Sequence, residues 1–155
     1  MPNKTAPTLK SRALRHLARR EWTRHELTLK LAPHAESEAE VAQLLDDFTS
    51  RGWLSEQRAA EQIARVRRSR YGMARIRHDL QAKGVPAEVV GTTLAGLKEG
   101  ELDAARAVWR RKFPAAPVNA AERAKQARFL QNRGFSSEII ARLLRGLGRG
   151  ETGEE

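Results

Sequence analysis

Apolar residues along the chain recur at intervals of three and four positions, the spacing that places side chains on one face of an α-helix. The alternation of apolar and polar residues that is typical of a half-buried strand is not sustained over any long stretch. Runs with helical spacing include Leu9, Ala13, Leu14 and Leu17, then Val41, Leu44, Leu45 and Phe48, then Ile139, Ile140, Leu143 and Leu144. The pattern predicts an all-α fold.

Capping and breaking residues mark where the helices should begin and end. Capping-box spacing occurs at Thr23 with Glu26, at Ser37 with Glu40 and, with asparagine as the cap, at Asn119 with Glu122. Helix breakers fall between the apolar runs at Gly52, Gly72, Gly84, Gly100, Gly134, Gly146, Pro33, Pro86 and Pro114. Together these signals predict about nine short helices.

The chain also repeats itself. Residues 80–97 and 130–147 share seven of eighteen residues at an offset of fifty. At an offset of forty-nine, apolar positions of the first third pair with apolar positions of the second, for example Leu27 with Ile76 and Leu45 with Leu94. The pattern predicts three tandem three-helix repeats, at about residues 9–53, 54–99 and 101–147.

A three-helix unit of this size buries little apolar surface alone, so neighbouring repeats are expected to pack on one another. The prediction is therefore an elongated helical array that could lie along a polymer. The ends, residues 1–8 and 148–155, have the composition of flexible tails.

The charge favours a polyanionic partner. The net charge is +10 and the pI is about 11.0. Residues 1–50 hold eight basic and seven acidic residues, whereas 51–100 hold ten and five and 101–155 hold eleven and seven. Basic side chains gain free energy by releasing counterions from phosphates, although the same charge could serve only solubility.

The sequence offers no catalytic, cofactor or metal chemistry. There is no cysteine, and His16, His25, His34 and His78 lack the spacing of metal-binding pairs. Adjacent helical residues such as Asp46 and Asp47 point about 100° apart and should not converge on one metal ion. The Gly-rich end lacks a phosphate-binding loop. We expect a non-enzyme without a cofactor.

The sequence also predicts a cytoplasmic protein. No apolar run approaches the roughly 18 residues of a membrane span, and the first residues lack the apolar core of a signal peptide.

The densest basic stretch is "RVRRSRYGMARIR". Ile63 and Val66 are expected on the buried side of its first helix, with the arginines outside and Gly72 permitting the turn. Tyr71 could stack on a base, but a core position is favoured. The candidate DNA- or protein-binding residues here are Arg65, Arg67, Arg68, Arg70, Arg75, Arg77 and, further on, Lys83.

A second basic set lies in the last third, where the alternative is a solvated helix face. It consists of Arg110, Arg111, Lys112, Arg123, Lys125, Arg128 and Arg133. Trp53 and Trp109 fall on apolar positions or repeat junctions, where packing between repeats is the favoured interpretation and anchoring to a partner the alternative.

Three motifs, in order, resemble those of one protein family. The first is a basic helix followed by Arg20-Glu21-Trp22-Thr23 and then Glu26-Leu27. The second is "RYGMARIRHDLQAKGV", with Gly72, Ile76, Leu80, Lys83 and Gly84. The third is Arg111-Lys112-Phe113 followed by Arg133-Gly134-Phe135-Ser136.

These motifs are similar to those of the RecX family of regulators of the bacterial RecA recombinase, over residues 9 to 147. One departure is Glu56-Gln57-Arg58-Ala59-Ala60, where the family usually has Asp-x-Arg-Phe-Ala; another is Val85, where the family often has isoleucine.

The resemblance implies a modulator, usually an inhibitor, that binds in the groove of the RecA filament on single-stranded DNA. It would reduce ATP hydrolysis, strand exchange and promotion of repressor cleavage. It would also bind DNA directly, with single-stranded DNA as the first ligand and duplex DNA as a further one. We expect a monomer acting in DNA repair, homologous recombination and the SOS response.

Two other functions remain open from the residues alone. One is a helix-turn-helix DNA-binding regulator, because a three-helix unit can place a helix in the major groove. The other is a helical scaffold that offers its basic face to an acidic protein.

Overall fold

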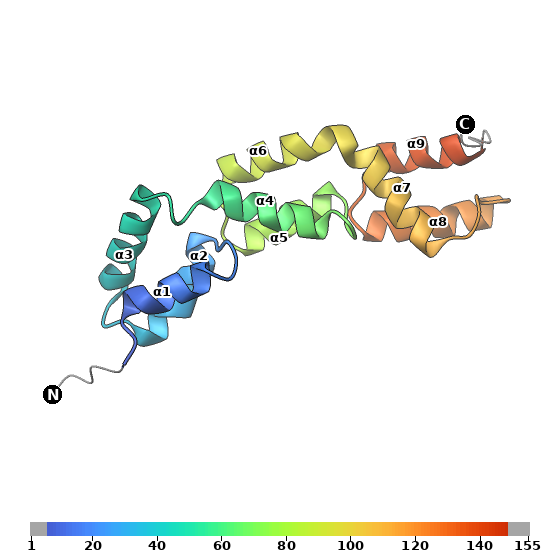
Figure 1. Cartoon of the computed structure of the whole chain (residues 1–155). Coiled ribbons are helices and arrows are strands. Elements are labelled where there is room, and N and C mark those ends of the chain that lie inside the picture. Colours follow the sequence, from blue (N-terminus) through green and yellow to red (C-terminus); the bar gives the residue numbers. More distant parts are fainter. Residues whose placement is uncertain (1–5, 149–155) are drawn as a thin grey trace. The chain divides into compact units, whose positions relative to one another are not determined.

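The computed structural model describes residues 6–148, and every regular element among them is helical. The chain therefore has the all-α fold that the sequence predicts. The elements are α1 (Leu9–Leu17), α2 (Arg24–Leu31), η1 (Ala32–His34), α3 (Glu38–Ser50), α4 (Glu56–Arg67), α5 (Met73–Ala82), α6 (Ala87–Leu97), η2 (Lys98–Gly100), α7 (Glu101–Lys112), α8 (Ala120–Asn132) and α9 (Ser137–Gly148) (Figure 1).

The described residues form two compact units. Unit 1 contains residues 6–62 and 80–90, and unit 2 contains residues 63–79 and 91–148. The helices α1, α2 and α3 belong to unit 1, and α7, α8 and α9 belong to unit 2. The helices α4, α5 and α6 each begin in one unit and end in the other.

The core of unit 1 fills the space enclosed by α1, α2 and α3. Its largest fully buried side chain is Phe48, around which the aliphatic residues of all three helices pack. Trp53 lies edge-on against Phe48, with ring centroids 5.4 Å apart, and keeps 40% of its surface exposed. The buried set is Ala13, Leu27, Leu31, Val41, Leu45, Phe48 and Leu54.

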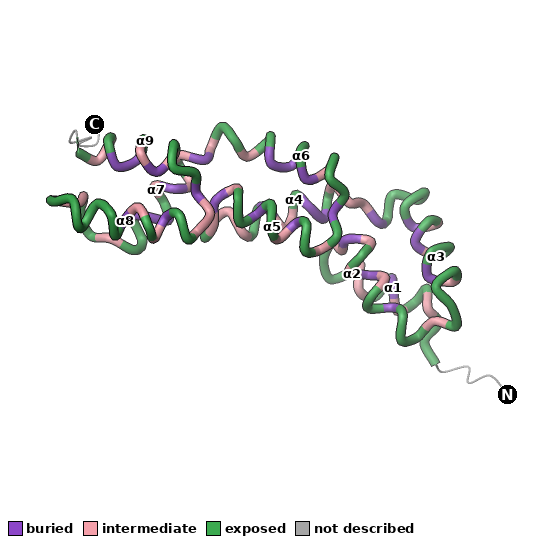
Figure 2. Tube along the Cα trace, turned by 180° about the vertical axis from the view of Figure 1, so that it is seen from behind, coloured by how far each residue is buried: buried purple, intermediate pink, exposed green. Residues whose placement is uncertain are grey.

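The core of unit 2 is built from the facing sides of α7, α8 and α9, and Figure 2 marks the buried positions of these helices in purple. Trp109 belongs to this core and donates from Nε1 to Oε1 of Gln126 at 2.7 Å. It therefore packs within one helix trio, whereas the sequence interpretation favoured packing between repeats. The buried set is Ala105, Val108, Trp109, Leu130, Phe135, Ile140, Leu143 and Leu144.

Local signals placed most helix ends correctly. Thr23 and Glu26 form a complete capping box, and the Ser37 hydroxyl and the Asn119 carboxamide accept from the backbone N–H groups of Glu40 and Glu122. Gly52, Gly84 and Gly134 follow helix ends with positive φ. The expected stop at Gly146 is wrong, because α9 continues to Gly148.

The predicted tails fall mainly on residues 1–5 and 149–155, which lie outside the described residues. Of the remainder, Thr8 caps α1 by accepting from the Ser11 N–H, and Gly148 is the last residue of α9.

One predicted core position of α4 is wrong. Val66 is 67% exposed, whereas Ala60 and Ala64 are buried. Ile63 is half-buried, and Ile76 and Leu80 of α5 are fully buried. Ala59 is also buried, so the inward-facing residues of α4 are alanines.

Candidate nucleic-acid interface

The start of α5 is joined to α7 and to the turn between α8 and α9 within unit 2. The backbone N–H groups of Gly72 and Ala74 donate to the carbonyls of Arg133 and Gly134 at 2.7 and 3.1 Å. The Met73 N–H donates to Oε1 of Glu101 at 3.0 Å. Because the first N–H groups of a helix have no partner inside the helix, these bonds satisfy them from a distant segment.

Two glycines of this joint, Gly72 and Gly134, lie so close to neighbouring backbone that a side chain would not fit. A Cβ atom built on Gly72 would lie 2.5 Å from the Gly134 carbonyl oxygen, and one built on Gly134 would lie 2.7 Å from the backbone nitrogen of Arg75. The φ of Gly134 is +94°, whereas Gly72 has no positive φ. Gly72 therefore makes room for the neighbouring backbone, which differs from the turn-forming role inferred from the sequence.

Unit 1 contains the same kind of joint. Thr23, Lys83 and Gly84 correspond at the repeat offsets to Gly72, Arg133 and Gly134, and Glu56 begins α4 as Glu101 begins α7. The Thr23 hydroxyl donates to the carbonyl of Lys83 at 2.7 Å, and the Arg24 N–H donates to Oε1 of Glu56. A Cβ on Gly84, which has a φ of +76°, would overlap the side chain of His25. In each unit, the carboxylate of a glutamate and the carbonyl of the Lys or Arg that precedes a glycine accept hydrogen bonds from residues at the start of a helix.

The environment of Glu101 makes the stability of unit 2 dependent on pH. Burial raises the pKa of this carboxyl group, and the Met73 N–H and the nearby Arg68 oppose the rise only in part. A raised pKa in the folded chain contributes stability that is complete below the pKa of the unfolded chain and is lost as pH rises through the folded pKa.

We therefore expect Glu101→Gln, which keeps an oxygen for the Met73 N–H, to gain stability relative to the wild type as the pH rises from acid to neutral. Urea denaturation of both proteins at a series of pH values measures the difference. A difference in unfolding free energy that stays constant with pH would show that the carboxyl group is not responsible.

The unit 2 joint brings three guanidinium groups around Tyr71. The Cζ atoms of Arg67, Arg75 and Arg133 lie 5.7, 4.8 and 5.5 Å from the ring centroid, within the range of cation–π attraction. Asp79 pairs with both Arg67 and Arg75, at 3.5 and 3.4 Å. Tyr71 is half-buried among these cations, so the favoured core assignment is wrong.

Beside this cluster lies an open hollow of about 310 Å³ in unit 2. Its cations come from the α4–α5 loop, from the last turn of α7 and from the residue after α8. None of them forms an ion pair with a carboxylate among the described residues. The residues that line it are Arg70, Val108, Arg111, Lys112, Phe129 and Arg133. We call these six residues the α7–α8 hollow.

Four of the predicted binding residues have structural partners. Arg68 donates to the Leu97 carbonyl at 2.7 Å, and Arg67 and Arg75 pair with Asp79. Lys83 pairs with Glu26 at 3.2 Å. Burial alone would raise the pKa of Glu26, but the Thr23 N–H, Lys83 and Arg20 lower it below its usual value. These cations hold the fold and are less available to a partner.

The other predicted residues fall into two groups. Arg70, Arg111, Lys112 and Arg133 come together at the hollow. Arg65, Arg77, Arg110, Arg123, Lys125 and Arg128 are exposed without a carboxylate partner among the described residues, and the start of α8 is green in Figure 2. Sequence reasoning missed Phe129, although its place four residues before Arg133 on a helix was a usable signal.

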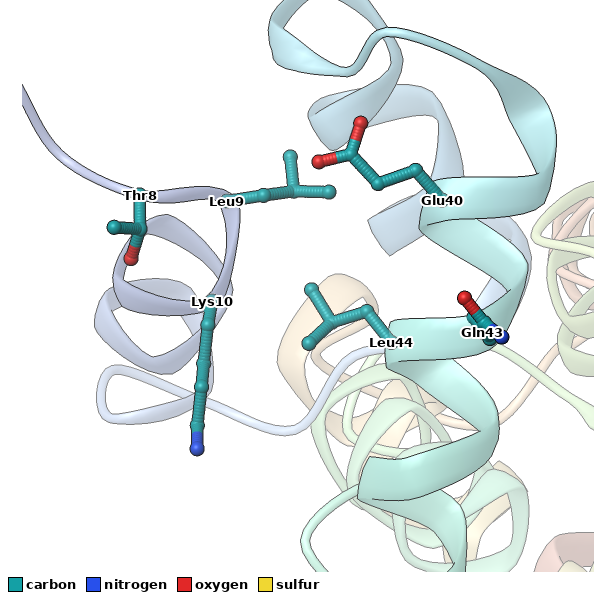
Figure 3. Close-up of a pocket in the computed structure, with 6 residues that line it drawn as sticks. All are labelled: Thr8, Leu9, Lys10, Glu40, Gln43 and Leu44. Atoms are coloured by element: carbon teal, nitrogen blue, oxygen red, sulfur yellow. The ribbon is translucent and has the colours of Figure 1, made fainter. Parts of the chain in front are cut away.

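A larger space, about 420 Å³, lies in unit 1 between the start of α1 and the middle of α3 (Figure 3). Leu9 and Leu44 point toward the gap, and both pack partly on the unit 1 core. Its polar lining combines Thr8, Lys10, Glu40 and Gln43. The Thr8 hydroxyl caps α1, and Glu40 accepts from the Glu36 N–H, so both already have partners within the chain.

Among residues 6–148, no group of three or more His, Cys, Asp or Glu side chains is placed to hold a metal ion. None of the helices in this part of the chain is both long enough and apolar enough to cross a membrane.

The fold and the matched domains define the chain as a protein built from tandem three-helix domains. Residues 55–94 match the family model of the second three-helix domain of RecX, and residues 99–144 match that of the third. The chain belongs to the RecX family of regulatory proteins.

Named relatives agree with this assignment. Regulatory protein RecX of Leptothrix cholodnii is 47% identical, over 92% of this chain and 91% of its own. Regulatory protein RecX of Ralstonia nicotianae is 46% identical, over 90% of this chain and 87% of its own length. The crystal structure of RecX from Lactobacillus salivarius has the same fold, with a TM-score of 0.81 over 91% of this chain and 95% of that one at 18% identity.

Proposed function

We propose that the protein is a modulator of RecA, acting as an inhibitor that binds in the groove of the RecA filament on single-stranded DNA. In this role it reduces ATP hydrolysis, strand exchange and RecA-promoted repressor cleavage, and it also contacts DNA directly. The proposal assigns the chain to the cytoplasm, as a monomer acting in homologous recombination, DNA repair and the SOS response.

The observation that carries the proposal is the α7–α8 hollow, where three separate segments gather cations that no carboxylate of the described residues neutralises. Guanidinium groups remain charged in partly dry interfaces and can bind phosphates through two hydrogen bonds. The helix α8 of the same unit carries further exposed cations, Arg123, Lys125 and Arg128. Membership of a family of regulatory proteins supports the same direction.

Inhibition by this route needs no chemical step. A protein that binds one state of a filament more tightly than another shifts the filament toward that state. A protein in the groove also occupies space that a displaced strand or a repressor would need. We propose that the predicted basic residues divide these contacts between DNA phosphates and acidic patches of RecA.

We expect the protein to bind RecA filaments on single-stranded DNA more tightly than it binds single-stranded or duplex DNA alone, because only the filament offers both kinds of contact. Co-sedimentation with filaments assembled on a non-hydrolysable ATP analogue measures this preference. Footprinting on duplex DNA is the counter-test. A discrete protected duplex site that forms without RecA would favour a helix-turn-helix regulator and contradict the proposal.

A further inference from the structure

The α7–α8 hollow combines cations with an apolar wall. Phe129 is half-buried and meets Phe113 edge-on, with ring centroids 5.3 Å apart. Lys112 Nζ lies 5.7 Å and Arg133 Cζ lies 5.1 Å from the centroid of the Phe129 ring. The hollow therefore offers positive charge and an aromatic surface to the same ligand.

Arg133 is held in place before any ligand arrives. Its guanidinium group is in cation–π contact with both Tyr71 and Phe129, at 5.5 and 5.1 Å. Its backbone carbonyl accepts from the Gly72 N–H. Ordering a long side chain in advance lowers the conformational entropy lost on binding. The joint between α5 and the α8–α9 turn thus positions a binding cation.

The size of the hollow limits what can enter. A volume of about 310 Å³ is at the lower end of the range for small-ligand sites, roughly 300–1,000 Å³. A helix or a duplex does not fit into such a space, although a single planar group with its attached phosphate does. The arrangement of cations around an aromatic wall is that of proteins that bind single strands, where phosphates meet basic groups and bases stack on rings.

We propose that the α7–α8 hollow holds one nucleotide of single-stranded DNA. The phosphates on either side of this nucleotide lie on Arg70, Arg111, Lys112 and Arg133, and its unpaired base lies against Phe129. This inference deepens the proposed function by naming the part of the filament that the hollow contacts, and it rests on that function for the choice of DNA. Paired bases in a duplex are stacked on one another and cannot reach Phe129.

The test uses the full chain and DNA without RecA. We expect a short oligothymidylate to bind about 5-fold or more tightly than an abasic oligomer of the same length and charge, because stacking contributes about 1 kcal/mol or more per base. Fluorescence anisotropy of labelled oligomers measures both affinities. Equal affinity for the two oligomers would overturn the inference.

Phe129→Leu is expected to bring the affinities for the two oligomers close to each other, because it removes the ring on which the base stacks. Thermal melting checks that this variant keeps its fold. If the Leu variant does not fold, Arg70→Gln/Arg111→Gln provides the second test, because these exposed residues pack in no core. It should weaken binding to both oligomers more than the matched pair Arg142→Gln/Arg145→Gln, two exposed arginines of α9.

Two results would contradict the location or the ligand. Equal losses in the two double variants would show that only total charge matters. Competition by polyglutamate as effective as that by oligothymidylate would show that the hollow binds acidic peptide. The oligomer experiment contains no RecA, so its outcome is separate from that of a RecA activity assay. A preference for thymidylate together with no effect on RecA activity would support the hollow and refute the proposed function. Equal affinities together with inhibition of RecA would overturn the hollow and support the proposed function.

Discussion

Replacing Gly134 with alanine is expected to lower the free energy of unfolding by about 2–5 kcal/mol. The left-handed conformation at φ +94° costs a residue with a Cβ about 1–2 kcal/mol. The new Cβ would also lie 2.7 Å from the backbone nitrogen of Arg75, and relief of such overlap typically costs a further 1–3 kcal/mol. Chemical denaturation monitored by circular dichroism measures the loss.

Gly52→Ala is the matched control. Gly52 has a similar φ of +76°, but a Cβ there would meet nothing within 4 Å, so only the conformational cost remains. Gly96→Ala, in an open position of α6, should instead raise stability by about 0.5–1 kcal/mol. If Gly134→Ala were no more costly than Gly52→Ala, the backbone contact at the α5 joint would not hold unit 2 together.

The helices could be predicted because their signals are local. The capping box at Thr23, the cap at Asn119 and the glycines after α3, α5 and α8 each act within a few residues, and the structure has helix ends at all of them. The elongated shape and the repeat boundaries at 9–53, 54–99 and 101–147 stay predictions.

Errors arose where a residue's role depends on a distant segment. The spacing of apolar residues in α4 fits a buried face with Ile63 and Val66 as well as one with Ala60 and Ala64. Alanine is only weakly apolar, so the hydropathy pattern does not show which of the two faces is buried. Small side chains allow close packing, and the alanines are buried while Val66 is exposed.

The candidate site was predicted in outline because charge is visible in a sequence, whereas partners are not. The sequence alone does not distinguish Arg68 from Arg70. In the structure, Arg68 donates a hydrogen bond to the Leu97 carbonyl, whereas Arg70 lines the hollow. Glu101 gave no sequence signal at all, because its role depends on the Met73 N–H twenty-eight residues away. Which cations face a partner is therefore a property of the tertiary structure.

The second large effect is expected from Arg70→Glu/Arg111→Glu, which reverses two charges at the α7–α8 hollow. Neither residue has an ion pair in the described part of the chain, so the fold should persist. Arg111 is in the last turn of α7, where a negative charge costs about 0.3–1 kcal/mol. Arg142→Glu/Arg145→Glu is the matched control, because Arg145 is in the last turn of α9 and the change in net charge is the same.

The most direct measurement is the rate of RecA ATP hydrolysis on single-stranded DNA as each protein is titrated in. We predict that the wild type and the α9 control lower the rate alike. The hollow variant should need about 10-fold more protein or more for the same inhibition, corresponding to a loss of about 1.4 kcal/mol of binding. A rate that the wild type leaves unchanged, at concentrations where it occupies the filament, would contradict RecA inhibition as the function of this protein.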